Sequence, residues 1–383
     1  MAKLQIGDRG IGDGFPTYFV ADIAANHDGS LERAKALIEL AKEAGADAAK
    51  FQNFRAPEIV SRVGFAQLGR QLSHQAQWKQ SVYEVYERAS VPWEWTPGLK
   101  AHCDRVGIEY FSTPYDLGAV DMLDPYVRAY KVGSGDITWL EILRAIANKG
   151  KPILMACGAS TIGEVVQAVE TIRRINPQLA LMQCNTNYTG SPENFAFINL
   201  NVLQSFRAMF PDLVLGLSDH TPGHATALGA VALGARVIEK HFTDDDRREG
   251  PDHGFSMTPS TWRDMVDRTR ELELALGSPI KRVEANEQET VIIQRRGLRA
   301  ARTLSAGTRI TREMLTVLRP APRDGIFPNS LEAVVGKRLR MKLEDGEVLR
   351  WTMLDDAEQD ADGQSRCSRD GGADRIASLS VAA

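Results

Sequence analysis

The sequence predicts an α/β fold, a (β/α)8 TIM barrel, followed by a small β-rich domain. Short apolar runs alternate with helical patterns over residues 1–277. Nearly every run leads into polar residues, and a barrel gathers such residues at the carboxyl ends of its strands. Two of the runs are followed within three residues by histidines, His220 and His241. A doubly wound open sheet is the structural alternative that the same alternation allows.

Eight apolar runs have the length and composition of strands. They are Tyr18–Ile23, Ala46–Phe54, Ile108–Phe111, Ala129–Val132, Pro152–Cys157, Leu179–Cys184, Leu213–Leu217 and Val237–Ile238. Helical patterns follow most of them, the clearest being Leu31–Ala44, Trp139–Lys149, Ile162–Arg174, Ala225–Leu233 and Ser260–Leu276. Parallel strands joined in this way bring their carboxyl ends to one mouth of the barrel.

The two histidines are candidate metal ligands. A strand, a helix and a second strand separate them, so both imidazoles should reach the same edge of the sheet. Neutral imidazole binds divalent metals, and two such donors leave positions open for water and substrate, as in a catalytic site. Alternatively, each histidine merely hydrogen-bonds a loop at the end of its strand.

Two lysines and several hydroxyls at the expected mouth suggest a phosphorylated substrate. Lys50 and Lys131 can neutralise phosphate charge. The hydroxyl donors at strand ends are Thr113, Ser134, Thr186 and Ser218. Either lysine could instead form a Schiff base, and the pattern does not separate these chemistries. A Walker A loop and a dinucleotide fingerprint are both absent from the sequence.

Composition excludes several classes of protein. The net charge of −4 argues against nucleic acid or an anionic membrane as the main partner. The four cysteines lack zinc or redox spacing, and the three in or near barrel elements are expected to be small buried hydrophobic residues. No apolar run approaches membrane-spanning length and no signal peptide is recognisable, which leads us to expect a soluble cytoplasmic protein. Among the aromatic residues, Tyr86, Trp93 and Trp95 are expected to pack the outer helical layer.

The barrel pattern ends near Gly277. Residues 278–293 form a charged connector, and residues 294–355 are dense in short strands and turns. The expected strands of this module include Arg299–Arg302, Leu315–Leu318, Gly336–Met341 and Val348–Trp351. A module of about 60 residues is marginally stable unless it docks elsewhere. Residues 356–383 are rich in Asp, Gly, Ser and Ala, and are expected to be disordered.

From about Tyr18 to Asp355 the chain resembles the sialic acid synthases, also called N-acetylneuraminate or nonulosonate synthases. The resemblance rests on several motifs in one order: Ala-Asp-Ile-Ala-Ala-Asn-His-Asp-Gly, Ala-Ala-Lys-Phe-Gln, Ser-Thr-Pro-Tyr, Tyr-Lys-Val-Gly-Ser-Gly-Asp, Gly-Leu-Ser-Asp-His-Thr, Glu-Lys-His-Phe-Thr and Gly-Pro-Asp-His. The C-terminal module resembles their antifreeze-like (SAF, β-clip) domain. The resemblance implies condensation of phosphoenolpyruvate with an open-chain N-acylated hexosamine, typically N-acetylmannosamine, to a nine-carbon 2-keto acid and phosphate.

The resemblance also implies site residues. It assigns His220 and His241 to Mn²⁺ or Mg²⁺, and Lys50 and Lys131 to electrostatic contacts with phosphoenolpyruvate. Thr113, Ser134 and Ser218 would bind the same substrate, and Gln52, Tyr188 and Asp252 would bind the sugar. Arg319 would reach the N-acyl group in the other subunit of a domain-swapped homodimer. Asp136 would move protons, and Asp22 would contact sugar hydroxyls.

Three departures from the family pattern put the acceptor sugar in doubt. Asp22 and Asp136 stand where relatives generally carry glutamate, so each carboxylate is drawn back by about 1.5 Å. Ala156 replaces a serine after the fifth strand, and residues 319–325 differ from the usual Arg-Pro-Gly-Asn-Gly. The alternatives are another phosphoenolpyruvate-dependent ulosonic acid synthase and a non-catalytic sugar-binding homologue.

Overall fold

The computed structural model describes residues 2–68, 75 and 78–355. The chain divides after Gly277 into two units, which are described here separately. The residues for which the sequence predicts a disordered tail, 356–383, lie outside the described part of the chain.

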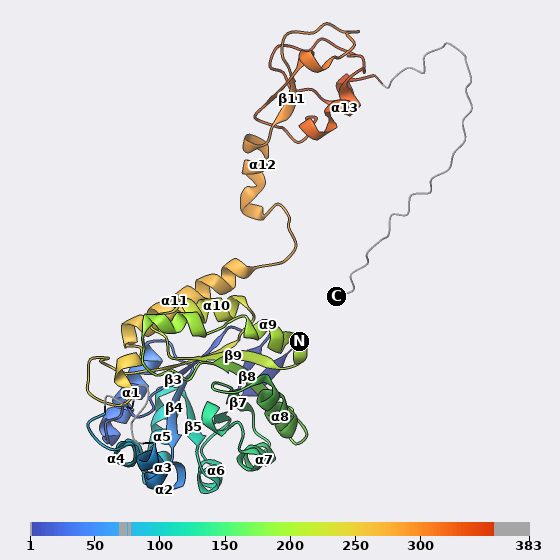
Figure 1. The fold of residues 1–383 in the computed structure, drawn as a ribbon. Helices are drawn as coiled ribbons and strands as arrows, with labels where there is room; N and C mark the ends of the chain where they lie inside the picture. Colours follow the sequence, from blue (N-terminus) through green and yellow to red (C-terminus); the bar gives the residue numbers. More distant parts are fainter. Residues whose placement is uncertain (1, 69–74, 76–77, 356–383) are drawn as a thin grey trace. The chain divides into compact units, whose positions relative to one another are not determined.

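The first unit is built on eight parallel strands (Figure 1). They are β3 (Tyr18–Asp22), β4 (Ala48–Asn53), β5 (Glu109–Pro114), β6 (Tyr130–Val132), β7 (Ile153–Ala156), β8 (Leu179–Cys184), β9 (Val214–Asp219) and β10 (Val237–His241). Their hydrogen-bonded order is β5-β4-β3-β10-β9-β8-β7-β6. The end strands β5 and β6 pack side by side, so the ring is nearly closed and the predicted barrel is confirmed.

Helices follow the strands and form the outer layer, as Figure 1 shows. They are α1 (Leu31–Glu43), α2 (Ala56–Ile59), α3 (Arg62–Gln67), α4 (Val82–Ala89), α5 (Thr96–Val106), α6 (Leu117–Leu123), α7 (Leu140–Asn148), α8 (Ile162–Arg173), α9 (Val202–Met209), α10 (Ala225–Ala232) and α11 (Pro259–Leu276). Local sequence fixes where they begin; in α8, for example, Thr161 and Glu164 form a capping box. Among the described helices, none has the length and apolar character needed to cross a bilayer.

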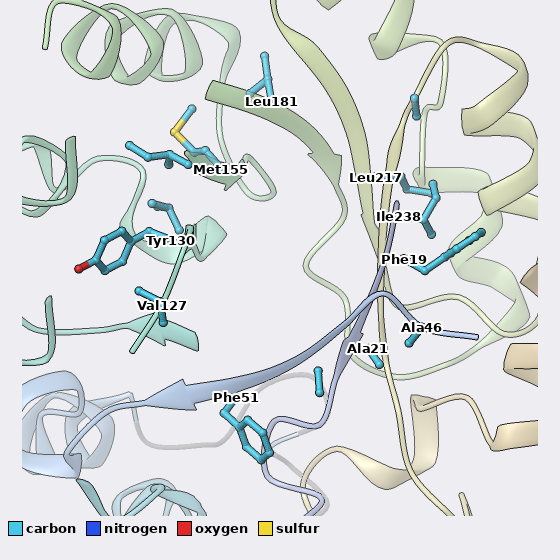
Figure 2. Close-up of a cluster of buried hydrophobic side chains, with 14 of the residues drawn as sticks. Phe19, Ala21, Ala46, Phe51, Val127, Tyr130, Met155, Leu181, Leu217 and Ile238 are labelled. Atoms are coloured by element: carbon cyan, nitrogen blue, oxygen red, sulfur yellow. The ribbon is translucent and has the colours of Figure 1, made fainter. Parts of the chain in front are cut away.

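Because side chains alternate between the two faces of each strand, the barrel has two separate apolar cores. Outward side chains such as Phe19, Met155 and Leu217 pack between the strands and the helices, as Figure 2 shows. Inward side chains such as Val20 and Met182 fill the amino-terminal half of the barrel interior. A hairpin that we did not predict, β1 (Lys3–Ile6) with β2 (Arg9–Gly12), contributes to the inner core. The next inward positions toward the carboxyl ends are polar, and they create the site.

The second unit has few regular strands. β11 (Gly297–Ala300) and β12 (Leu315–Leu318) pair antiparallel, and the short helices are α12 (Gln288–Gln294) and α13 (Leu331–Val334). The expected strands at 336–341 and 348–351 form only isolated bridges. Gly307, Gly336 and Gly346 have φ of 78°, 92° and 75°, and these left-handed turns interrupt the ladders. Helix α12 also begins inside the predicted connector.

Candidate active site

A cavity of about 430 Å³ opens at the carboxyl ends of the barrel strands. Twelve of the fourteen residues predicted for the site line it: Asp22, Lys50, Gln52, Thr113, Lys131, Ser134, Asp136, Tyr188, Ser218, His220, His241 and Asp252. Because side chains alternate along a strand, an inward apolar residue is followed two positions later by an inward polar one. Val20 and Asp22 on β3 are one example, and Ala48 and Lys50 on β4 are another.

Lys50 is held by two carboxylates inside the barrel. Its Nζ donates a hydrogen bond of 2.6 Å to Asp22 Oδ2 and lies 3.8 Å from Glu239 Oε1. Gln52 Nε2 also donates to Asp22 Oδ2, at 3.1 Å. Burial lowers the pKa of Lys50, but the attraction of Asp22 and Glu239 outweighs it and raises the pKa above its ordinary value. Lys50 therefore keeps its positive charge although it is buried.

Glu239 joins the two lysines, and sequence reasoning missed it. Its Oε1 lies 3.5 Å from Lys131 Nζ and accepts a hydrogen bond of 3.2 Å from Ser218 Oγ. The signal that could have identified Glu239 was the strand period of two, since it lies two residues before His241 on β10. The predicted strand ends at Ile238, where the polar residues begin. Polar residues instead continue the strand inside the barrel mouth.

Asp136 lies in the short 3₁₀ turn that follows β6, after Lys131 in the sequence. Burial raises its pKa to about 6, against the opposing effect of Lys131. Within the described part of the chain, its buried Oδ2 has no hydrogen-bond partner. A carboxyl group that has this pKa and belongs to a residue lining the cavity has the properties of a general acid or base near neutral pH.

The two imidazoles come together as predicted. The ring centroids of His220 and His241 are 5.4 Å apart, and the Asn185 carbonyl lies 2.9 Å from His220 Nδ1. Because Nδ1 makes that contact, Nε2 is the ring nitrogen of His220 that remains for binding an ion. Burial lowers the pKa of His220, and burial together with His220 lowers the pKa of His241 well below its ordinary value. Both rings are therefore neutral, the form that binds metals.

The donor set fits a divalent ion. Among the residues that the structure describes, His241 Nδ1 is buried without a hydrogen-bond partner, and Asp252 Oδ2 lies 4.0 Å away. No group of three or more His, Cys, Asp or Glu surrounds one ion position in residues 2–68, 75 and 78–355. Two imidazole donors leave the remaining positions of such an ion to water and substrate, which is the arrangement of a catalytic site.

Asp252 and Tyr188 form the wall beside the histidines. The centroid of the Tyr188 ring lies 4.3 Å from that of the His220 ring and 5.5 Å from that of the Phe255 ring. Asp252 Oδ2 accepts a hydrogen bond of 3.0 Å from the Ala25 amide. Burial nevertheless raises the pKa of Asp252 to about 6, and the charge of Asp22 adds to the rise. This wall presents one carboxyl group and one aromatic face to a ligand.

Two predicted site residues are not among those that line the cavity. Thr186 packs beside Gly158, where an added Cβ would lie 2.6 Å from Thr186 Cγ2, while Ser134 Oγ accepts a 2.9 Å hydrogen bond from the Gly158 amide. Arg319 is an exposed residue of the second unit, directly after β12. Its role in the site stays a prediction.

Aromatic residues also line the cavity. Tyr86 on α4 packs against Phe54, with ring centroids 5.3 Å apart, and lines the cavity together with Trp78 and Tyr115. The expectation that Tyr86 only packs the outer helical layer was wrong. The segment between β4 and β5 is long enough to return α4 to the barrel mouth, which periodicity within α4 does not reveal.

Comparison with known proteins identifies two families along the chain. The NeuB family matches residues 37–281, and the SAF domain matches residues 295–355. An N,N'-diacetyllegionaminic acid synthase of Legionella pneumophila is 34% identical over 350 residues, covering 90% of this chain and 96% of that protein. The N-acetylneuraminate-9-phosphate synthase of Homo sapiens is 31% identical over 348 residues, covering 91% and 95%. The crystal structure of an N-acetylneuraminic acid synthetase from Leptospira borgpetersenii in complex with citrate superposes with a TM-score of 0.66, at 27% identity, over 76% of this chain and 95% of that chain.

Proposed function

The chain belongs to the NeuB family, and from that premise we propose that it condenses phosphoenolpyruvate with an open-chain N-acylated amino sugar. The products would be a nine-carbon 2-keto acid of the sialic acid type and inorganic phosphate. The observation that carries the proposal is the convergence of Lys50, Lys131, His220 and His241 on one cavity. Relatives named for sialic and legionaminic acid synthesis support the class of product.

Phosphoenolpyruvate would bind at the lysine end of the cavity. Lys50 and Lys131 are electrostatic clamps for its phosphate and carboxylate, and Thr113, Ser134 and Ser218 donate hydrogen bonds to it. The raised pKa of Lys50 supports this role over Schiff-base formation, because only a neutral amine can attack a carbonyl. Thr186 would not contact the substrate directly, and would act by packing against Gly158.

The amino sugar would bind at the histidine end. Gln52, Tyr188 and Asp252 contact it there, and Asp22 lies where it can meet a sugar hydroxyl. Arg319 would contact the N-acyl group from the second subunit of a domain-swapped homodimer. Docking on a partner would also stabilise a domain as small as the second unit.

His220 and His241 would hold Mn²⁺ or Mg²⁺. Their neutral rings support this, and so does His241 Nδ1, which has no hydrogen-bond partner among the described residues. When bound, the ion supplies Lewis-acid polarisation of the sugar's aldehyde. The protein's own groups orient the two substrates so that C3 of the enol faces C1 of the aldehyde.

Asp136 would take the proton from the water molecule that adds to C2. Once C3 has formed the new carbon–carbon bond, C2 is electron-poor and takes up a water molecule. Asp136 accepts the proton of that water, which its pKa of about 6 allows at neutral pH. The C2–O bond to phosphate then breaks as the hydroxyl at C2 becomes a carbonyl and gives its proton to the phosphate, whose charge is held by Lys50 and Lys131. The proton on Asp136 passes to the alkoxide oxygen formed from the sugar's aldehyde.

The test is a panel of N-acylated hexosamines, simple aldoses and phosphorylated aldoses, each mixed with the full-length protein, Mn²⁺ and phosphoenolpyruvate. We expect phosphate release that depends on the acceptor, and a product whose mass equals that of the acceptor plus a three-carbon keto-acid unit. Release without an acceptor, release only with phosphorylated aldoses, or no release at all would each contradict the proposal. The panel is needed because relatives of similar identity bear the names of different products.

A further inference from the structure

A buried ion pair lies behind the two histidines, and it has no role in the proposed reaction. Asp219 and Lys240 are register partners in the ladder between β9 and β10, and their side chains pair with 0% and 1% exposure. Each directly precedes one histidine in the sequence, His220 and His241. Because side chains alternate, the pair lies on the outer face of the strands while the histidines face the cavity.

The pair fastens the backbone on both sides of His220. Lys240 Nζ donates to the Asp219 carboxylate and also to the Thr221 carbonyl, at 2.6 Å. Asp219 Oδ2 accepts further hydrogen bonds, each of 2.7 Å, from the hydroxyls of Thr221 and Thr226. Residues at the end of β9, in the following loop and in the first turn of α10 are thereby tied to Lys240.

Stability is a poor explanation for this network. Removing two charges from water costs several kcal/mol per ion, and well-packed apolar residues of similar volume often stabilise a core as well or better. A hydrogen-bonded pair fixes the relative placement of its two groups, whereas an apolar pair does not. Here the hydrogen-bonded pair joins the two strand ends that carry the imidazoles.

We propose that Lys240 and Asp219 are positioning residues that set the separation of the His220 and His241 imidazoles. The Asn185 carbonyl already orients the His220 ring, so the spacing of the two backbones is what remains to be set. Lys240 spans that spacing, since it belongs to one strand and holds both neighbours of His220 on the other. The inference rests on the proposed function, because it takes the histidine pair as the site of a divalent ion.

The experiment measures Mn²⁺ affinity of the full-length protein without substrates, from the electron paramagnetic resonance signal of free Mn²⁺. The test variant is Asp219→Asn with Lys240→Met, which removes both charges together and so avoids a lone buried ion. The control is Asp124→Asn with Lys151→Met, which removes a 2.8 Å ion pair beside the amino end of β7. Thr226→Val is a milder test variant that deletes one donor to Asp219.

We expect the double variant to fold and to bind Mn²⁺ roughly 10–100-fold more weakly, the usual cost of losing a group that orients metal ligands. Thr226→Val should weaken binding in the same direction by less, and the control should bind as the wild type does. Unchanged Mn²⁺ affinity in the folded double variant would overturn the inference and leave the proposed function intact. If the double variant does not fold, unchanged affinity in Thr226→Val overturns it. A wild type that does not bind Mn²⁺ would instead overturn the histidine site itself.

Discussion

Lys50 Nζ donates a 2.6 Å hydrogen bond to Asp22 Oδ2, and both side chains are 3% exposed. The two residues are register partners on β4 and β3. The same carboxylate oxygen accepts from Gln52 and lies 3.5 Å from His241 Nε2. One carboxylate thus connects the lysine end of the cavity to the histidine end, so the length of the Asp22 side chain bears on both ends.

Replacing Asp22 with glutamate is expected to change the preferred acceptor. The longer side chain moves the carboxylate by about 1.5 Å into the cavity, which is enough to make or break a direct hydrogen bond. A misplaced polar contact costs about 1–3 kcal/mol, so preference should shift toward N-acetylmannosamine by roughly tenfold or more in relative kcat/KM. If the wild type already uses N-acetylmannosamine best and Asp22→Glu keeps the ranking, the shorter acid has no bearing on specificity.

Activity should fall as the pH is lowered through about 6. Burial raises the pKa of Asp136 to about 6, and a base works only when deprotonated, so its contribution is present above this pH and lost below it. Asp136→Asn should lower kcat by roughly 10²–10⁴-fold and remove its part of the acidic limb in kcat/KM. Asp252 also has a pKa of about 6, so Asp252→Asn is the matched control and should keep the Asp136 limb. Full activity in Asp136→Asn would exclude it as the base.

Loss of either histidine should abolish condensation and leave the barrel folded. One remaining imidazole holds a divalent ion far less well than two, so His220→Ala and His241→Ala should each lose most activity, and a chelator should inactivate the wild type. Circular dichroism controls for folding, and added Mn²⁺ should restore the chelated wild type but neither variant. Full turnover by protein shown to be free of metal would contradict this part of the account.

Much of the fold follows from the sequence because one physical pattern repeats. Apolar runs bounded by polar residues mark buried parallel strands, and the run predicted at Leu179–Cys184 coincides with β8. The same pattern places polar strand ends at one mouth, which is why Lys50, Lys131 and both histidines were found together.

The sequence was less informative where burial depends on distant parts of the chain. Glu239 was missed because a buried carboxylate is stabilised by lysines on other strands, and nothing near it in sequence shows them. The hairpin of β1 and β2 was missed because its strands are short and its apolar residues pack on the barrel interior, not on each other alone. In the second unit, turns at glycines limit the strands more than composition suggests.

Arg319 is expected to act in the partner subunit. Arg319→Ala should lower kcat/KM for the amino sugar by roughly 10–150-fold, the cost of a charge-assisted hydrogen bond of about 1.5–3 kcal/mol. Mixing Arg319→Ala with His220→Ala should restore up to about a quarter of wild-type activity, because half of the random dimers are hybrids with one intact site of two. No recovery after confirmed subunit exchange would mean that Arg319 serves its own barrel or no site.

The most direct test of the central claim is a turnover with phosphoenolpyruvate labelled with ¹⁸O at the bridging oxygen, followed by mass spectrometry of phosphate and product. Cleavage of the C2–O bond predicts that the label leaves in the phosphate, that the product gains three carbons, and that borohydride traps no adduct on Lys50 or Lys131. Label retained in the keto acid would contradict cleavage of the C2–O bond, and a trapped lysine adduct would contradict the clamp mechanism and return the site to Schiff-base chemistry.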